Sequence, residues 1–298
     1  MLKKKNKEKT FDASISTWGI IGRELVRDKI AMIALTILVG IILFIIIMPF
    51  FIDADANLTV NLMRVNQPPS DAHILGTENT GRDAFALLVV GARNSLQVSF
   101  MVTLITGAVG IILGLFAGYY GGLFDNILMR VVDFISTLPV LVMIIAFLAI
   151  IPGFNVWRFT FIMSIFLWPS ITRMVRARAI QEKELEYIQA SKTLGTSHLK
   201  TIFTALLPNI SSIVIVNMTL NAAANIGLET GLSFLGFGFP FEHPSLGSLT
   251  ALAADPIVLQ HRWWVWLPAT LLVFVIMLSI NTLGRMLQRA TDARLRRG

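Results

Sequence analysis

The stretch IAMIALTILVGIILFIIIMPFF, residues 30–51, runs for 22 residues without a charged side chain. About 20 apolar residues in a helix cross the hydrocarbon core of a bilayer, so this stretch predicts a membrane-spanning helix. A secretory signal peptide is the alternative, because Ala54-Asp55-Ala56 resembles a small-residue cleavage site. The apolar core of a signal peptide has roughly 7–15 residues. The longer run, and the long arm before it (residues 1–29), favour a membrane span.

Five similar runs follow along the chain. The sequence as a whole is 55% hydrophobic and only 14% charged, too little charge to cover the surface of a soluble domain of this length. We therefore predict an all-α polytopic membrane protein with six transmembrane helices. Beyond 30–51, the predicted spans are 96–119, 127–151, 156–172, 210–228 and 267–287.

The basic residues predict the orientation of these spans. Of the 25 Lys and Arg residues, 20 lie in the arm 1–29, near Arg130, in the loop 173–208 and in the tail from 285. Basic residues are enriched on the cytoplasmic side of membrane proteins. Both termini (1–29 and 288–298) and the loop 173–208 are therefore expected in the cytoplasm, and the segments 52–95 and 229–266 outside. Four tryptophans are expected in a belt at the outer interface: Trp157, Trp263, Trp264 and Trp266.

The position of this charge also bears on partners. A net charge of +7 could indicate a nucleic-acid-binding protein. The basic residues lie beside and between the apolar runs, which favours membrane orientation and no nucleic-acid partner. The chain has no cysteine, which excludes disulfides, iron–sulfur clusters and thiol catalysis.

The loop 173–208 is polar and basic, yet it has the pattern of short helices. Gly195 is suited to the left-handed conformation that ends a helix. Ser197 is a candidate N-cap for a second helix, 198–206. A helix–turn–helix at the membrane surface is suited to docking into a groove of a partner protein. A simple connector between two spans is the alternative.

Residues 186–195, EYIQASKTLG, followed by Leu207-Pro208, resemble the EAA loop of permeases from binding-protein-dependent ABC importers. The family pattern is Glu-Ala-Ala, three residues, Gly, nine residues and Ile-x-Leu-Pro. This chain departs from it at Gln189, Ser191 and Ala205. Gln189 carries no charge for a salt bridge at the family position of the glutamate, and Glu186 lies one turn earlier. The resemblance assigns ATPase coupling to Glu186, Gln189, Ala190, Ser191, Gly195, Leu207 and Pro208.

Further motifs resemble the oligopeptide, dipeptide and nickel branch of that family, and its second type of permease subunit. They are residues 73–83 (HILGTENTGRD), 91–96 (GARNSL), 232–238 (LSFLGFG) and 244–247 (PSLG). The resemblance implies the type I ABC importer permease fold, with a permease core over 96–290. It also implies the partners: a homologous second permease subunit, two ATPase subunits that bind ATP and Mg, and an external peptide-binding protein.

Two sets of residues recur every four positions, and so each shares one helix face. Four glycines form the first set: Gly110, Gly114, Gly118 and Gly122. They favour close helix packing, with a gating hinge as the alternative. The second set is polar and is expected to face inward, because polar groups are costly in lipid. It lines the pathway or bonds neighbouring helices, and its members are Asn217, Asn221, Asn225 and Glu229.

Other polar residues have simpler interpretations. Asp133 is three residues from Arg130, a spacing that predicts a local ion pair rather than a proton relay. The apolar stretch 232–241 is broken by Gly and Pro, so we expect a re-entrant element, or else an ordinary packed loop. The four histidines have no metal-ligand spacing and are expected at the surface or in loops.

No sequence motif indicates an enzyme. There is no Gly-x-x-x-x-Gly-Lys-Ser/Thr, no His-Glu-x-x-His and no Gly-x-Ser-x-Gly. We expect a transport subunit in the cell membrane, with no cofactor of its own, that imports oligopeptides. Dipeptides, nickel chelates and glutathione are alternative substrates. A secondary transporter or intramembrane enzyme is a more distant alternative, and it needs ionisable residues that converge at the bilayer midplane.

Overall fold

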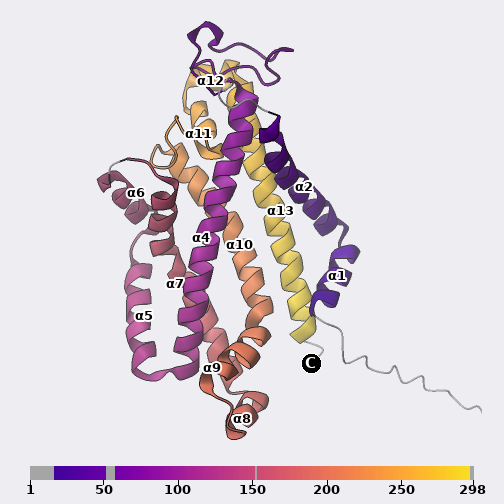
Figure 1. Ribbon diagram of the computed structural model, residues 1–298, viewed down its shortest axis with the longest axis vertical. Coiled ribbons are helices and arrows are strands. Elements are labelled where there is room, and N and C mark those ends of the chain that lie inside the picture. The colour runs from indigo at the N-terminus through magenta and orange to yellow at the C-terminus, as the bar shows by residue number, and fades with distance from the viewer. Residues whose placement is uncertain (1–16, 52–57, 152, 296–298) are drawn as a thin grey trace, which may run out of the picture.

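A computed structural model describes residues 17–51, 58–151 and 153–295. These residues form a bundle of long helices, and among them the extended pairing is limited to one isolated bridge, Thr77 with Asp83 (Figure 1). The lysine-rich part of the arm and the Ala54-Asp55-Ala56 sequence lie outside the described residues. The last three residues of the tail lie outside them as well.

The helices of the bundle follow the apolar runs, and most of them are longer than those runs. The α-helices are α1 (Thr17–Arg27), α2 (Lys29–Ile47), α4 (Ala84–Tyr120), α5 (Gly122–Thr137), α6 (Val140–Ile150), α7 (Val156–Lys183), α8 (Glu186–Thr193), α9 (His198–Thr201), α10 (Leu207–Phe234), α11 (Leu246–Ala251), α12 (Pro256–His261) and α13 (Trp263–Leu295). Short helical turns occupy Met48–Phe50, Leu62–Arg64, Ile202–Leu206 and Leu252–Ala254.

Four stretches of the described residues are long and apolar enough to cross a membrane: Lys29–Phe50, Ala84–Tyr120, His198–Phe234 and Trp263–Thr291. The pair α5 and α6 makes a fifth if it is counted as one bent span. Large apolar side chains on these helices are more than half exposed, among them Phe100, Leu271 and Phe274. Broad exposure of such side chains fits lipid contact. The chain is therefore a multi-pass helical membrane protein.

The expected span 156–172 is not among these candidates, although α7 includes all of it. Arg158 lies near the start of α7, and four basic residues occupy its second half: Arg173, Arg176, Arg178 and Lys183. The helix continues to Lys183, so the first part of the expected loop 173–208 is helical. Much of α7 is buried against other helices, which gives its buried polar residues, Thr160, Ser164 and Thr172, a protein environment in place of lipid.

The expected span 127–151 is not one helix. α5 ends at Thr137, α6 begins at Val140, and the two axes differ by 83°. Pro139 lies at this break and has no N–H with which to continue the helix. Pro139 by itself predicts a break here, but the continuous apolar run around it favoured a single span.

The expected span 96–119 begins much earlier, at Ala84. Asp83 caps the helix by accepting a hydrogen bond from the backbone N–H of Ala86 at 2.9 Å. The first turns of α4 are packed in protein, and Asn94 donates to the carbonyl of Pro244 at 2.7 Å. Part of the expected external segment 52–95 is therefore a helix, because protein contacts as well as apolarity stabilise it.

Close packing of α4 on α7 forms the centre of the bundle. A Cβ atom at Gly110, Gly114 or Gly118 would lie within 2.8 Å of atoms of α7, at Ile171, Val175 and Ala179 respectively. The glycine ridge is therefore a packing seam, as predicted for three of its four members. Gly122 is the exception, since α4 has ended and no atom lies within 4 Å of the position of its Cβ.

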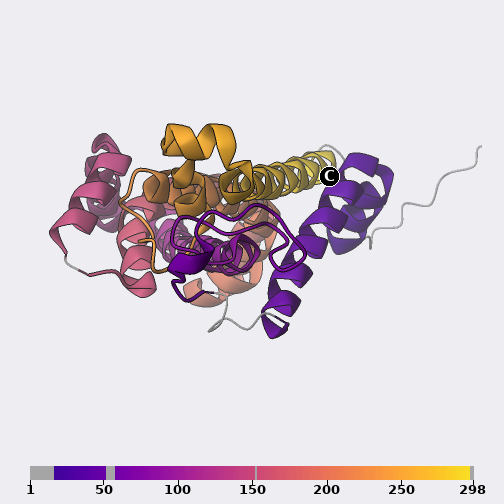
Figure 2. The ribbon, with the colours of Figure 1, turned by 90° about the horizontal axis from the view of Figure 1, so that it is seen from above.

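Above the helices lies a cap, which we define as residues 58–83 and 235–262. Seen from above, the loop 58–83 lies across the end of α4, and the helices α11 and α12 lie beside it (Figures 1 and 2). At the opposite end, α8 and α9 form the tip of the molecule (Figure 1). We call residues 184–201 the α8 loop.

Candidate functional site

The α8 loop has the helix–turn–helix shape that its sequence predicts. Gly195 has φ +79° and follows Leu194, the C-cap residue of α8. The N–H of Thr196 donates to the carbonyl of Ser191 at 3.1 Å, and that of Gly195 to Lys192 at 2.9 Å. These two bonds are the Schellman arrangement, which ends a helix at a left-handed glycine. Ser197 precedes α9 as predicted, but its side chain makes no capping hydrogen bond.

Most residues assigned to ATPase coupling lie at the surface of this loop. Glu186, Gln189, Ala190, Gly195 and Pro208 are exposed, and Ser191 and Leu207 are half-buried. Ile188 is fully buried and anchors α8 to the bundle. The exposed surface includes large apolar side chains at Leu185, Leu194, Leu199 and Phe203, and Leu194 is 85% exposed. Exposed apolar groups at a helical tip are typical of a docking surface.

Gln189, which replaces the family glutamate, makes a specific contact. Its side-chain amide donates a hydrogen bond to the carbonyl of Lys183 at 2.9 Å. That carbonyl belongs to the last residue of α7, so the contact ties α8 to the helix before it. A glutamate carboxylate has no donor for this bond. The amide therefore holds α8 in a way that the family residue could not.

Tyr187 holds the same joint, although sequence reasoning did not single it out. Its hydroxyl donates to the carboxylate of Glu182 and accepts a bond from the amide of Asn209 at 2.8 Å. Burial, together with the bond to Glu182, raises the pKa of Tyr187. The side chain thus links the end of α7 to the start of α10 across the loop. A tyrosine beside a coupling motif carries no sequence signal for such a role.

A second link joins the loop to α4. The Tyr119 hydroxyl lies 3.0 Å from Nδ1 of His198, and the ammonium of Lys192 lies 5.0 Å from the centre of the Tyr119 ring. The rings of Tyr119 and His198 meet edge to face. His198 was expected at the surface or in a loop. It is exposed, but it connects the tip to the end of the central helix.

The asparagine stripe on α10 bonds within the protein. Asn225 is buried and donates to the hydroxyl of Thr103 on α4 at 2.9 Å. Asn217 donates to the carbonyl of Ile213 in its own helix at 2.9 Å, and Asn221 is half-buried. At Asn225 the geometry therefore favours interhelical bonding over the pathway-lining alternative.

Glu229, the last member of the stripe, is fully buried within protein. The hydroxyl of Ser233 donates to Oε1 of its carboxylate at 2.8 Å, and Ser95, Thr230 and Ser245 lie nearby. Ser95 lies in the GARNSL motif and Ser245 in the PSLG motif. Oε1 is thereby hydrogen-bonded, whereas Oε2 and the hydroxyl of Thr230 are buried without a hydrogen-bond partner among the described residues. Three of the sequence motifs meet around Glu229.

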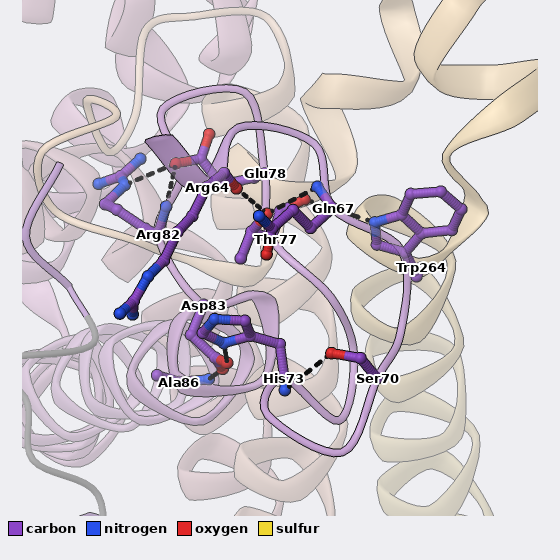
Figure 3. A network of polar contacts seen from close by, with 10 residues as sticks. All are labelled: Arg64, Gln67, Ser70, His73, Thr77, Glu78, Arg82, Asp83, Ala86 and Trp264. Carbon is purple, nitrogen blue, oxygen red and sulfur yellow. Dashed lines mark hydrogen bonds and ion pairs between the residues drawn. The ribbon is translucent and has the colours of Figure 1, made fainter. Parts of the chain in front are cut away.

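The HILGTENTGRD motif in the cap forms a network of polar contacts (Figure 3). Arg82 pairs with the buried Glu78 at 2.9 Å and donates to the carbonyl of Phe241 at 2.8 Å, which joins the two parts of the cap. His73 and Asp83 form a second buried pair, with 2.7 Å between Nδ1 and Oδ2. The buried carboxylates of Glu78 and Asp83 therefore each have a side-chain partner, which offsets part of the cost of burying them.

Two glycines allow the chain to follow this path. Gly76 has φ +63° and Gly81 φ +81°. A Cβ atom at Gly81 would lie 1.9 Å from the carbonyl oxygen of Asn61, and one at Gly76 2.4 Å from that of Gln67. Trp264 donates to the carbonyl of Thr77 at 3.4 Å, so it packs on the cap rather than lying only in an interfacial belt (Figure 3).

The ion pair predicted between Arg130 and Asp133 is not formed. Asp133 pairs with Arg173 of α7 at 2.8 Å, and not with Arg130 as predicted from the spacing. Among the described residues, no group of three or more His, Asp or Glu side chains is placed to hold a metal ion.

Comparison with known proteins agrees with the motifs. Residues 110–297 match the family described as the inner membrane component of binding-protein-dependent transport systems, and residues 16–69 match the N-terminal transmembrane domain of oligopeptide transport permease C. The chain is 45% identical to the oligopeptide transport system permease protein OppC of Lactococcus lactis, over 96% of this chain and 98% of that one.

Two proteins of Bacillus subtilis are also similar. The oligopeptide permease OppC is 34% identical, over 97% of this chain and 94% of its own length. The dipeptide permease DppC is 36% identical, over 98% of this chain and 92% of its own. These relatives are permease subunits of transport systems and not enzymes. The chain belongs to the inner membrane components of binding-protein-dependent transport systems, as a permease of the ABC importer type.

Proposed function

We propose that this chain forms half of the transmembrane pathway for ATP-driven import of oligopeptides. A homologous second permease subunit supplies the other half. Two ABC ATPase subunits bind ATP and Mg and drive the cycle, and an external peptide-binding protein delivers the substrate. The relatives named for oligopeptide transport, matched along almost their whole length, support this substrate class.

The observation that carries the proposal is the shape of the α8 loop. α8 protrudes at one end of the bundle, ends at the left-handed Gly195 and exposes Leu194. A short helix with exposed apolar residues fits a groove on a partner. We assign the ATPase contact to Glu186, Ala190, Ser191 and Gly195, with Gln189, Leu207 and Pro208 holding the loop.

The proposed topology has six crossings with both termini in the cytoplasm. The count of basic residues on each side supports this orientation. α7 serves as a further crossing, supported along one side by its packing on α4. In this orientation the cap is external, where it meets the binding protein, and the α8 loop is cytoplasmic.

A matched pair of variants tests the docking role. Asn and Asp both tolerate a left-handed backbone, so Gly195→Asn and Gly195→Asp should both fold. The charge of Gly195→Asp is placed in the proposed interface, and unpaired buried charge is costly. We expect Gly195→Asp to insert normally but to lose ATPase co-purification and peptide uptake, while Gly195→Asn keeps more of both. Normal ATPase binding and uptake in Gly195→Asp would contradict the docking role.

The substrate class needs a separate test. The similarity to a dipeptide permease keeps dipeptides as the second candidate. A strain that lacks this gene should fail to grow on a defined tetra- or pentapeptide as the source of an essential amino acid, and should still grow on the corresponding dipeptide. Loss of growth on the dipeptide alone would assign the chain to dipeptide import. Loss of nickel or glutathione uptake alone would assign it to those substrates.

A further inference from the structure

The bend between α5 and α6 encloses space against α7. At the 83° turn a cavity of about 500 Å³ opens between the two helices and the proline-containing middle of α7. This volume is within the range of ligand-binding pockets. Its lining combines apolar side chains, among them Phe166 and Pro169, with Ser136, Ser170, Arg173 and the flexible Met174. We call this the elbow groove.

Charged groups of both signs lie at the edge of the elbow groove. Arg173 donates to the carboxylate of Asp133 at 2.8 Å and to the hydroxyl of Ser136 at 3.3 Å. The side chains of Arg173 and Asp133 are 54% and 63% exposed. Ser136 and Ser170 are exposed as well. Exposed charges on membrane helices are costly in lipid, so this face must meet water or protein.

The polar stripe on α10 offers no comparable surface. Asn225 and Glu229 are buried, and their side chains bond to Thr103 and Ser233. Asn217 bonds to its own helix. The stripe therefore presents less exposed polar surface than the elbow groove, whose Asp133, Ser136, Ser170 and Arg173 are all exposed.

We propose that the elbow groove lines the translocation pathway and contacts the peptide directly. This inference rests on the proposed function, because it assumes a peptide substrate. The guanidinium of Arg173 suits the terminal carboxylate, and Asp133 suits the terminal ammonium. Ser136 and Ser170 offer hydroxyls to the peptide backbone. Met174 is flexible and polarisable, which suits side chains of varied shape.

The ion pair within the chain keeps this contact weak. Arg173 and Asp133 satisfy each other when no peptide is present, so a peptide terminus that binds one of them exchanges an existing ion pair for a new one. An exchange of similar interactions has little net driving force, which lets a substrate move on. A pathway for peptides of varied sequence requires such weak contacts.

Thiol labelling tests whether the groove is open to water. The chain has no native cysteine, so single cysteines can be placed in the whole importer, reconstituted with its partner subunits. We would compare Ser136→Cys on α5 and Ser170→Cys on α7 with Ser164→Cys. Ser164 is a buried residue of α7 and serves as the control. With the charged reagent MTSET we expect the first two to react at least about tenfold faster than Ser164→Cys, and to be protected by pentaalanine.

Peptide charge tests the role of Arg173. We would measure the saturated uptake rates of pentaalanine and of its C-terminal amide, so that the affinity of the binding protein has little influence. Arg173→Gln should lower the rate for pentaalanine relative to the amide by about threefold to tenfold, whereas Arg173→Lys should keep the wild-type ratio. A tenfold change is the scale of one lost charge-assisted hydrogen bond.

The outcomes separate the two levels of the proposal. Absence of peptide uptake by the wild-type importer would overturn the proposed function itself. Normal uptake with Ser136→Cys and Ser170→Cys as unreactive as Ser164→Cys would overturn the elbow groove alone. Reactivity without protection by peptide, and with unchanged rate ratios in Arg173→Gln, would make the groove a wet surface and not a peptide contact. Cysteine cross-linking to the second permease would make it a subunit interface.

Discussion

The two ends of the molecule are built differently. The cap is joined by buried ion pairs and by turns that only glycine can adopt, as at Glu78–Arg82 and Gly81. The α8 loop is mostly exposed and is held by a few side chains, chiefly Tyr187, Gln189 and Tyr119. The difference indicates that internal contacts fix the shape of the cap, while few internal contacts hold the α8 loop.

A glycine-to-alanine substitution in the cap and one in the α8 loop should show the largest difference in stability between the two ends. Gly81→Ala forces a Cβ to within 1.9 Å of the Asn61 carbonyl, at φ +81°. We expect it to destabilise the folded protein by about 3 kcal/mol or more. Gly195→Ala has a similar φ of +79° but no atom within 4 Å, so about 1 kcal/mol is expected. Thermal unfolding of the purified complexes in detergent measures both. Equal losses would contradict the comparison.

Buried and exposed ion pairs give the next largest difference. Glu78→Gln removes the charge from a carboxylate that is 2% exposed and paired with Arg82, and we expect a loss of about 2–3 kcal/mol. The control, Asp133→Asn, breaks a pair whose members are more than half exposed, and should cost less than about 1 kcal/mol. Comparable shifts in unfolding temperature would mean that the cap is no more dependent on its charges than the bundle.

In the α8 loop the expected effect is on coupling more than on stability. Tyr187→Phe keeps the ring but removes the hydroxyl that joins Glu182 and Asn209. We expect about 1 kcal/mol of lost stability and a fall in the peptide imported per ATP hydrolysed. Simultaneous measurement of uptake and ATP hydrolysis by the reconstituted importer checks this. An unchanged ratio would show that the link between α7 and α10 does not transmit force.

The smallest effect on stability is expected at Gln189, the position where the family pattern has glutamate. Gln189→Glu restores the residue of the family pattern but loses the donor to the Lys183 carbonyl. Because the site is exposed, the cost should be about 0.5–1 kcal/mol. Gln189→Ala, which also lacks the donor, is the control. If Gln189→Glu stabilises the protein while Gln189→Ala does not, the glutamate has found another partner and the amide is not essential.

The apolar runs were sufficient to predict helices, but not their limits. α4 and α7 extend beyond their runs because Asn94 and the basic residues near Arg176 are stabilised by protein contacts that hydropathy does not register. The break at Pro139 was visible as a proline, yet the continuous apolar pattern outweighed it. Gly122 fits the four-residue spacing but lies past the end of the helix, a boundary that spacing alone does not mark.

The candidate sites were predictable where the signal is local. Gly195 has the conformation that its place after α8 predicts, since a helix end is decided within a few residues. The partners of Asp133 and Asn225 were not predictable, because Arg173 and Thr103 are far along the chain. The same limit applies to Glu229, whose hydroxyl neighbours come from three separate motifs.

The glycine seam between α4 and α7 has a mechanical consequence. At Gly110, Gly114 and Gly118 the backbones of α4 and α7 are in close contact, with few side-chain atoms between them that could rearrange. The two helices are therefore expected to move together as one rigid body. α7 ends beside the α8 loop, and α4 runs 37 residues, about 55 Å, up to the cap. A small tilt imposed at the tip is thereby delivered to the far end of the molecule as a larger lateral displacement.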